Sequence, residues 1–308
     1  MQRRNTRAKL PPKVVEPEPA SILFEQITPN VHKATFCGVR AGWEGWVLLS
    51  SDRHNDNIKS NRDLQLRHLE QLKERNGLGL DFGDLFDAMQ QRGDNRSNRD
   101  EIRPEDNTEK YFDSIVEHSA EFYAPYARWL RLFSRGNHES SALKYHGMDL
   151  TNNLVYRINT HEQTTGTVYR GGYGGWVMLQ FNIRDTVRVT KRLKYFHGSG
   201  GGGQVTKGVI STNRQAVYQP DADIVVNGHT HDNWHLPLGR ERINQAGVVS
   251  KDLIHFIRLP SYKDEYRDGA DGWHVERWGE PKPIGAVWLR FYLDPLGDLQ
   301  FDVVRAVV

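Results

Sequence analysis

Cysteine and long apolar runs are scarce or missing in this 308-residue sequence. Cys37 is the single cysteine, which excludes an internal disulfide framework and a thiolate-rich zinc site. No stretch approaches the roughly 18 apolar residues of a membrane span. Basic residues at positions 3–9 are not followed by the apolar run of a secretory signal. We therefore expect a cytoplasmic protein with no membrane partner.

A strong net charge is also missing. The sequence has 41 basic and 39 acidic residues, so its formal net charge is +2. This near-balance neither requires nor excludes a nucleic-acid partner. Residues 1–20 are basic and proline-rich, a composition that predicts a disordered tail. The alternative for this tail is an electrostatic tether to nucleic acid or to another partner.

Residues 21–308 are expected to form a single domain. The whole sequence is 37% hydrophobic and 26% charged, which is typical of a folded protein. Residues 88–110 are mostly polar, and we interpret them as an exposed insertion.

Short apolar runs alternate with helix-like patterns in the first half of the chain. Strands are predicted near 31–39, 45–50, 79–82 and 129–133, and helices near 58–75 and 109–128. The second half is rich in strand patterns, near 176–181, 187–189, 193–196, 223–226, 233–237, 242–248, 252–259, 285–293 and 298–307, with a helix near 204–217. This order predicts an α/β fold with two packed sheets.

Five of the predicted strands end in a polar cluster, at the carboxyl ends where functional groups gather in open α/β sheets. The clusters begin at Asp52, Asp84, Asn137, His197 and His229. The Asp-x-His block at 52–54 and the His-x-His block at 229–231 are expected to point two side chains the same way from an extended backbone. Arg53 would then point away from the cluster and have a structural role.

The candidate ligands offer oxygen and imidazole nitrogen but no sulfur. This mixture does not fit a structural zinc site, and it has too many imidazoles for a typical magnesium or calcium site. Seven ligands exceed what one tetrahedral metal takes, so two divalent cations that share a carboxylate fit better. Manganese is favoured, with iron, zinc, nickel or magnesium as alternatives. The seven are Asp52, His54, Asp84, Asn137, His197, His229 and His231.

The ordered set of blocks resembles the calcineurin-like metallophosphoesterase superfamily. The blocks are Asp-Arg-His at 52–54, Gly-Asp-Leu-Phe-Asp at 83–87, Gly-Asn-His-Glu at 136–139, His-Gly at 197–198 and Gly-His-Thr-His at 228–231. Alone, each block is common at a surface or in a turn, but five in order are not. The residues of these blocks are most similar to those of the DNA-repair exonucleases of the superfamily. The resemblance implies a four-layer αββα sandwich, with two mixed sheets flanked by helices.

The resemblance also implies a role for each matched residue. Asp52, His54 and His231 would bind one metal, and Asn137, His197 and His229 the other. Asp84 would bridge both metals. His138 would contact the phosphate and protonate the leaving oxygen, oriented by Asp87. A metal-bound hydroxide would attack phosphorus in line.

The substrate is less determined than the reaction. We expect a phosphodiesterase that acts on nucleic acid or a nucleotide. A phosphomonoesterase, including a protein phosphatase, is the alternative, and a non-catalytic metal-binding scaffold is a remote one. Trp273 and Trp278 are candidates to stack on bases, unless their loop packs on its own domain. Tyr262 and Lys263 follow a predicted strand and are further candidate substrate contacts.

Overall fold

A computed structural model gives the fold of the chain. It describes residues 21–88, 99–184, 186–201, 206–266, 269, 273–276 and 279–308. The predicted tail at 1–20 lies outside the described residues, as does the 89–98 part of the predicted insertion. None of the helices in the described ranges is long and apolar enough to span a membrane.

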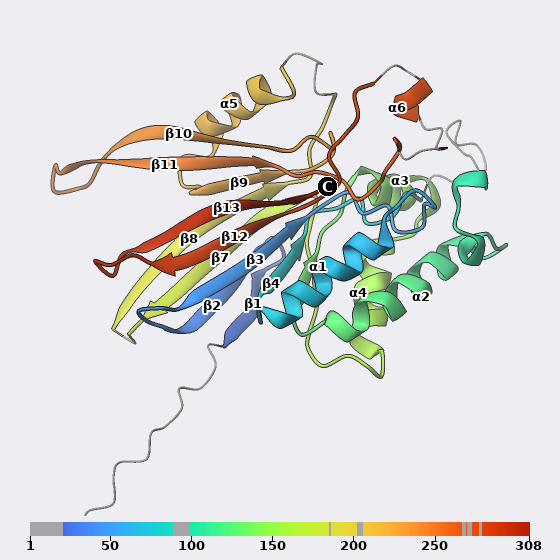
Figure 1. The fold of residues 1–308 in the computed structure, drawn as a ribbon, viewed down its shortest axis with the longest axis horizontal. Coiled ribbons are helices and arrows are strands. Elements are labelled where there is room, and N and C mark those ends of the chain that lie inside the picture. The colour runs from blue at the N-terminus through green and yellow to red at the C-terminus, as the bar shows by residue number, and fades with distance from the viewer. Residues whose placement is uncertain are drawn as a thin grey trace, which may run out of the picture.

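Two mixed β-sheets lie face to face (Figure 1). In spatial order, the seven-stranded sheet consists of β1 (Ile22–Thr28), β2 (Val31–Val39), β7 (Gly174–Ile183), β8 (Val187–Phe196), β9 (Ile224–Asn227), β11 (Val249–Arg258) and β10 (Trp234–Ile243). The six-stranded sheet consists of β13 (Leu299–Val307), β12 (Gly285–Leu293), β3 (Glu44–Ser50), β4 (Leu78–Asp81), β5 (Leu130–Phe133) and β6 (Tyr169–Arg170).

Alternating side chains of the two sheets form the central core. Along β7 every second residue is buried, including Val177, Leu179 and Phe181, as expected for a strand with one face on the core. The short strands β4 and β9 are buried on both faces, which explains their uninterrupted burial. The core therefore lies between the sheets, and helices cover the outer faces.

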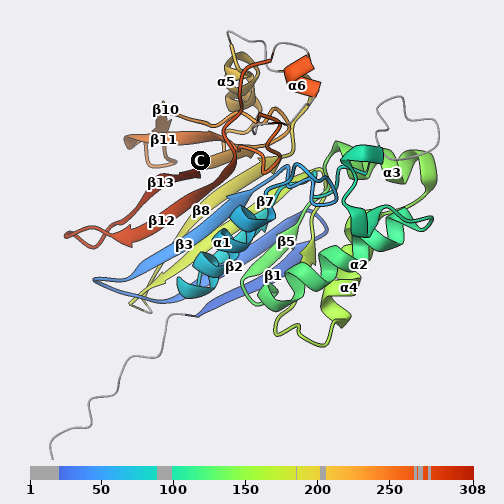
Figure 2. The ribbon, with the colours of Figure 1, turned by 45° about the vertical axis from the view of Figure 1, so that its right-hand side comes forward.

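Helices flank the sandwich on both sides, which confirms the predicted layers (Figure 2). Helices α1, α2 and α4 cover the six-stranded sheet and share its outer hydrophobic cluster. Helix α5 lies over the other sheet, where Ala216 packs on a small cluster that includes Val225 and Phe256. The helices are α1 (Arg62–Glu74), α2 (Tyr111–Tyr123), α3 (Asn137–His146), α4 (Leu150–Thr160), α5 (Val209–Tyr218) and α6 (Trp273–Glu276).

Several predicted boundaries differ from the observed ones. Helix α1 begins at Arg62 and not near residue 58, because Asn61 caps it by accepting a hydrogen bond from the Leu64 amide. The strands predicted at 233–237 and 242–248 are one strand, β10, followed by a turn stabilised by Asn244. Strand β1 and helices α3 and α4 are not among the predicted elements.

The described part of the predicted insertion is mostly exposed, as expected, but it is not without regular structure. Residues 99–110 contain the 3-10 turns η1 (Arg99–Glu101) and η2 (Pro104–Asp106), and a third turn, η3 (Ala124–Tyr126), follows α2. Arg103 donates hydrogen bonds to the carbonyl oxygens of Asn55 (2.9 Å) and Ser60 (2.6 Å). Arg103, the residue before η2, therefore holds residues 55–60, in the segment after β3, in place.

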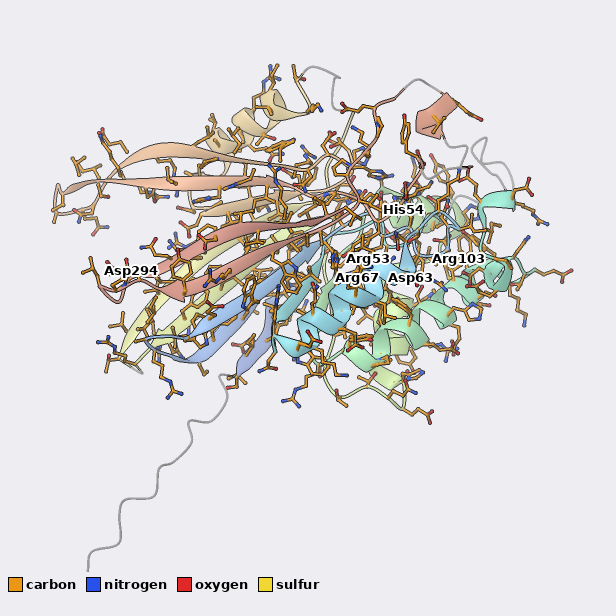
Figure 3. All side chains as sticks on the ribbon, viewed as in Figure 1. Arg53, His54, Asp63, Arg67, Arg103 and Asp294 are labelled. Carbon is orange, nitrogen blue, oxygen red and sulfur yellow. The ribbon has the colours of Figure 1, made fainter. Side chains whose placement is uncertain are left out.

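Arg53 is the main anchor beneath the carboxyl ends of the strands. Its guanidinium is fully buried and lies 2.7 Å from Asp81 and 2.9 Å from both Gln65 and Ser50. Figure 3 places Arg53 and His54 at the opposite end of the sandwich from Asp294, which lies in the turn after β12. The structural role predicted for Arg53 is confirmed.

Loss of this anchor should destabilise the fold. We expect Arg53→Met to lower the free energy of unfolding by about 3–5 kcal/mol, because Asp81 would stay buried without its cation. Urea unfolding of the metal-free protein, followed by circular dichroism, measures the change. Arg157→Met is the matched control, since its ion pair with Glu117 is exposed, and it should unfold like the wild type. Unchanged stability of Arg53→Met would contradict the anchor role.

Candidate metal centre

The loops after the strands carry their polar residues on an unusual backbone. Positive φ angles occur at Asp52 (53°), His54 (45°), Asp84 (52°), His229 (73°) and His231 (57°). Such left-handed conformations are disfavoured for residues with a Cβ and persist only where the surroundings hold them. The side chains of the Asp-x-His and His-x-His blocks therefore converge through left-handed turns. The expectation that they lie on extended backbone is wrong.

Hydrogen bonds between the loops hold these turns in place. The amide of Asp52 donates to the Gly83 carbonyl (2.8 Å), and the amide of His54 donates to the Asp84 carbonyl (3.1 Å). The amide of His229 donates to Asp52 Oδ2 (2.9 Å). Each loop is thus fixed by another loop of the site.

Two glycines are required by the close approach of these loops. A Cβ on Gly136 would lie 2.1 Å from Asp84 Oδ1, and a Cβ on Gly228 would lie 2.5 Å from Asp52 Oδ2. Neither position has room for a side chain, which explains why glycine precedes Asn137 and His229.

The seven predicted ligands meet in two adjoining groups. Asp52, His54 and His231 form the first, in which His231 Nε2 lies 3.2 Å from Asp52 Oδ1 and 3.4 Å from His54 Nε2. Asp84, His197 and His229 form the second, in which His197 Nε2 lies 3.0 Å from Asp84 Oδ2.

Asn137 completes the second group, and Asp84 connects the two groups. Asn137 Oδ1 lies 3.1 Å from His197 Nε2 and 2.7 Å from His229 Nδ1, so Asn137 belongs to the second group. Asp84 also shares a potential metal-binding group with His54, a member of the first. This position between the groups is the one expected of a bridging carboxylate.

The electrostatics of the centre favour added positive charge. Burial raises the pKa of Asp84, but the charges of His197 and His138 outweigh it, so the pKa lies below its usual range. Burial likewise raises the pKa of Asp52, and the contact with His231 and other imidazole charges lowers it further than burial raises it. For His197, burial lowers the pKa, but Asp84 and Asp52 raise it to about 10. A divalent cation would replace such protons.

The donor set fits divalent cations. His54 Nδ1 faces Asp87 Oδ1 (2.9 Å) and His197 Nδ1 faces the Phe82 carbonyl (2.9 Å), so both imidazoles turn Nε2 into the centre. Metal-bound histidines are oriented in this way by a carboxylate or a carbonyl. Asp52 Oδ1 is buried and accepts no hydrogen bond, although His231 Nε2 is near, and such an oxygen is suited to a cation.

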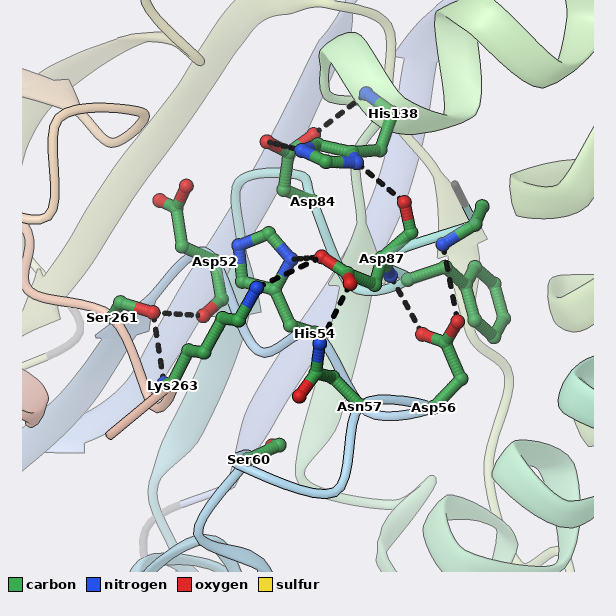
Figure 4. A network of polar contacts seen from close by, with 12 residues as sticks. Asp52, His54, Asp56, Asn57, Ser60, Asp84, Asp87, His138, Ser261 and Lys263 are labelled. Atoms are coloured by element: carbon green, nitrogen blue, oxygen red, sulfur yellow. Dashed lines mark hydrogen bonds and ion pairs between the residues drawn. The ribbon is translucent and has the colours of Figure 1, made fainter. Parts of the chain in front are cut away.

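His138 lies beside both groups, in the first turn of α3. Its ring is 11% exposed, and Nε2 lies 3.6 Å from Asp84 Oδ2. Nδ1 contacts the backbone carbonyl of Asp87 and not its carboxylate, which faces His54 (Figure 4). Asp87 therefore orients His138 through its main chain, a detail that differs from the predicted side-chain contact.

Two acidic residues that had no predicted role support the loop at 84–88. Glu139 accepts hydrogen bonds from the amides of Gly136 (2.7 Å), Asp84 (3.2 Å) and Phe86 (3.0 Å). Burial, together with the charge of Asp84, raises the pKa of Glu139 to about 7. The glutamate three residues after Gly136, in the pattern of a helix N-terminus, is the signal that would have indicated this contact.

Asp56 supports the end of the same loop, at residues 87 and 88. It accepts hydrogen bonds from the amides of Asp87 (2.6 Å) and Ala88 (3.1 Å) (Figure 4), and also from the Tyr111 hydroxyl. The carbonyl that contacts His138 is therefore held by a buried carboxylate.

The four candidate substrate contacts have different outcomes. Tyr262 is fully buried, its hydroxyl lies 2.8 Å from His68 Nδ1, and its ring packs on Arg53, so the predicted substrate contact is wrong. Lys263 is also buried, among carboxylates. Trp273 begins α6, but its side chain is outside the described part of the structure, and Trp278 lies outside it entirely.

No family model matches the sequence, and no curated protein matches it. Solved structures are similar to it at low sequence identity. The calcineurin-like phosphoesterase YfkN of Bacillus subtilis is 11% identical over 85% of this chain and 90% of its own, with a TM-score of 0.36. Vps29 of Chaetomium thermophilum is 11% identical over 85% and 96%, with a TM-score of 0.36. GAP50, described as the anchor in the inner membrane complex of Plasmodium, is 10% identical over 84% of both chains, with a TM-score of 0.39.

Proposed function

We propose that this protein is a metal-dependent hydrolase of phosphoesters that uses two divalent cations. The observation that carries the proposal is the convergence of seven ligand side chains from five strand ends into two groups around Asp84. A mixed carboxylate, amide and imidazole set suits manganese, and iron, zinc, nickel or magnesium remain alternatives. Such cations supply a water of lowered pKa and neutralise charge on the phosphate.

His138 is the proposed proton donor. The Asp87 carbonyl accepts a hydrogen bond from Nδ1, so Nδ1 carries a hydrogen and Nε2 faces Asp84 and the ligand groups. When the ring is doubly protonated, Nε2 also carries a hydrogen and is placed to give it to the leaving oxygen of an ester bound between the two groups. A scaffold that only binds metal has no need of such a group, which favours an enzyme over the scaffold alternative.

The proposed substrate is a phosphodiester of nucleic acid or a nucleotide. This part of the proposal rests on the Gly-Asp-Leu-Phe-Asp and Gly-Asn-His motifs, which resemble those of DNA-repair exonucleases. The proposed location is the cytoplasm, in keeping with the lone Cys37.

A substrate panel separates the three candidate functions. We expect the manganese-loaded protein to cleave bis-p-nitrophenyl phosphate and single-stranded DNA, and chelation to abolish cleavage reversibly, because the cations activate the water. p-Nitrophenyl phosphate is the monoester comparison. Preferred cleavage of the monoester would point to a phosphomonoesterase, and no turnover with any substrate would point to a scaffold.

Asp84 should be needed for both metals. We expect Asp84→Ala to lose both manganese ions, because each group would lose an oxygen ligand. Asn137→Ala is the comparison, since Asn137 contacts only the second group in the interactions described above, and it should keep one ion. Elemental analysis of the purified variants measures the stoichiometry. Two ions bound to Asp84→Ala would contradict the bridging role.

His138 should be needed for turnover but not for metal binding. We expect His138→Ala to keep two manganese ions and to lose about 10²–10⁴-fold in kcat, the usual contribution of a proton donor. His146→Ala is the matched control, because His146 is exposed at the other end of the same helix. Unchanged kcat in metal-replete His138→Ala would remove His138 from the mechanism.

A further inference from the structure

The carboxylate of Asp87 lies at a buried junction behind the first group of ligands. Oδ1 faces His54 Nδ1 at 2.9 Å, and Oδ2 accepts a hydrogen bond from the side-chain amide of Asn57 at 2.7 Å (Figure 4). The Lys263 ammonium lies 3.5 Å from Oδ1. The side chains of Asp87, His54 and Lys263 are all less than a tenth exposed, so water contributes little to stabilising the charge.

Lys263 is held among carboxylates and does not face the substrate. Its Nζ lies 3.3 Å from Glu265 and 3.8 Å from Glu101, in addition to Asp87. Lysine is almost never buried unless it is paired, and this one is paired with three acidic groups. The ammonium is thus held inside the site by these three ion pairs.

The backbone around Lys263 is fixed to the same ligands. The Tyr262 amide (3.0 Å) and the Ser261 hydroxyl (2.7 Å) both donate hydrogen bonds to the Asp52 carbonyl, and the Lys263 amide donates to Ser261 Oγ (2.9 Å). Lys263 also forms a β-bridge with Ser60. One short segment after β11 therefore positions the backbone of Asp52 and the side chain of Asp87.

We propose that Lys263 is a positioning residue of the metal centre, which acts on His54 through Asp87. Lys263 holds the Asp87 carboxylate in place, and Asp87 in turn accepts the hydrogen bond of His54 Nδ1 and directs Nε2 to the first metal. This inference rests on the proposed metal centre and adds to it a cation that contacts neither metal nor substrate. Partners of this kind typically contribute 10–100-fold to metal affinity.

The test is manganese binding to the full-length, metal-free protein, measured by calorimetry. We expect Lys263→Met to bind its first-group manganese 10–100-fold more weakly and the other ion with wild-type affinity, matching the ion lost in His54→Ala. Lys263→Gln is measured in parallel, so that the test does not depend on the folding of a single variant. Lys263→Arg keeps the positive charge and should bind the first-group manganese with most of the wild-type affinity. Lys59→Met is the matched control, because Lys59 also forms an ion pair with Glu101 (2.9 Å), and its affinities should not change.

A double-mutant cycle with Asp87→Asn tests the route of the effect. If Lys263 acts through Asp87, the losses from Lys263→Met and Asp87→Asn will not add. Wild-type affinity for both ions in any Lys263→Met or Lys263→Gln variant that folds, or additive losses in the cycle, would overturn the proposal. Failure of the proposed function would differ: the wild-type protein would bind two ions and hydrolyse no ester, while the binding test of Lys263 would remain valid.

Discussion

The burial of many carboxylates at one end of the sandwich is the constraint on which the rest of the site depends. A buried carboxylate is tolerated only when hydrogen bonds or opposite charge replace its water. The described part of the chain meets this need differently at each position. Asp81 has the guanidinium of Arg53, and Glu139 has three backbone amides. Asp56 has two backbone amides and the Tyr111 hydroxyl.

The remaining carboxylates separate into two kinds. Asp87 has a dedicated cation, Lys263, in addition to His54. Asp52 and Asp84 contact imidazoles that are themselves candidate metal ligands. The supporting carboxylates named above thus have permanent partners. Each central carboxylate has one oxygen that accepts a hydrogen bond from a backbone amide and one, Asp52 Oδ1 or Asp84 Oδ2, that faces an imidazole a metal would share. Such a division is expected of a metal centre and not of a network of buried ion pairs.

Much of this site could be predicted from the sequence, because strand ends and ligand types are local features. An apolar run that ends in a polar block indicates both a strand and its carboxyl end, as at Ser50 before Asp52 and at Asp81 before Asp84. The meeting of five such ends follows from the fold class. The left-handed backbone of Asp52 and His54 could not be predicted, because it depends on hydrogen bonds to the loop at 83–85.

The contacts of Tyr262, Lys263 and Asp87 could not be predicted for a related reason. A strand end predicts that the next residues lie near the site, but the direction of each side chain depends on how the segment packs. Tyr262 turns to Arg53 and His68, whereas Lys263, the next residue, turns to Asp87. The main chain and the side chain of Asp87 contact different residues, which the sequence alone does not reveal. Its carbonyl faces His138 and its carboxylate faces His54. The main chain of Asp87 thus orients the proposed proton donor, and its side chain orients a proposed metal ligand. A substitution at Asp87 removes the side-chain contact with His54 but keeps the carbonyl that contacts His138.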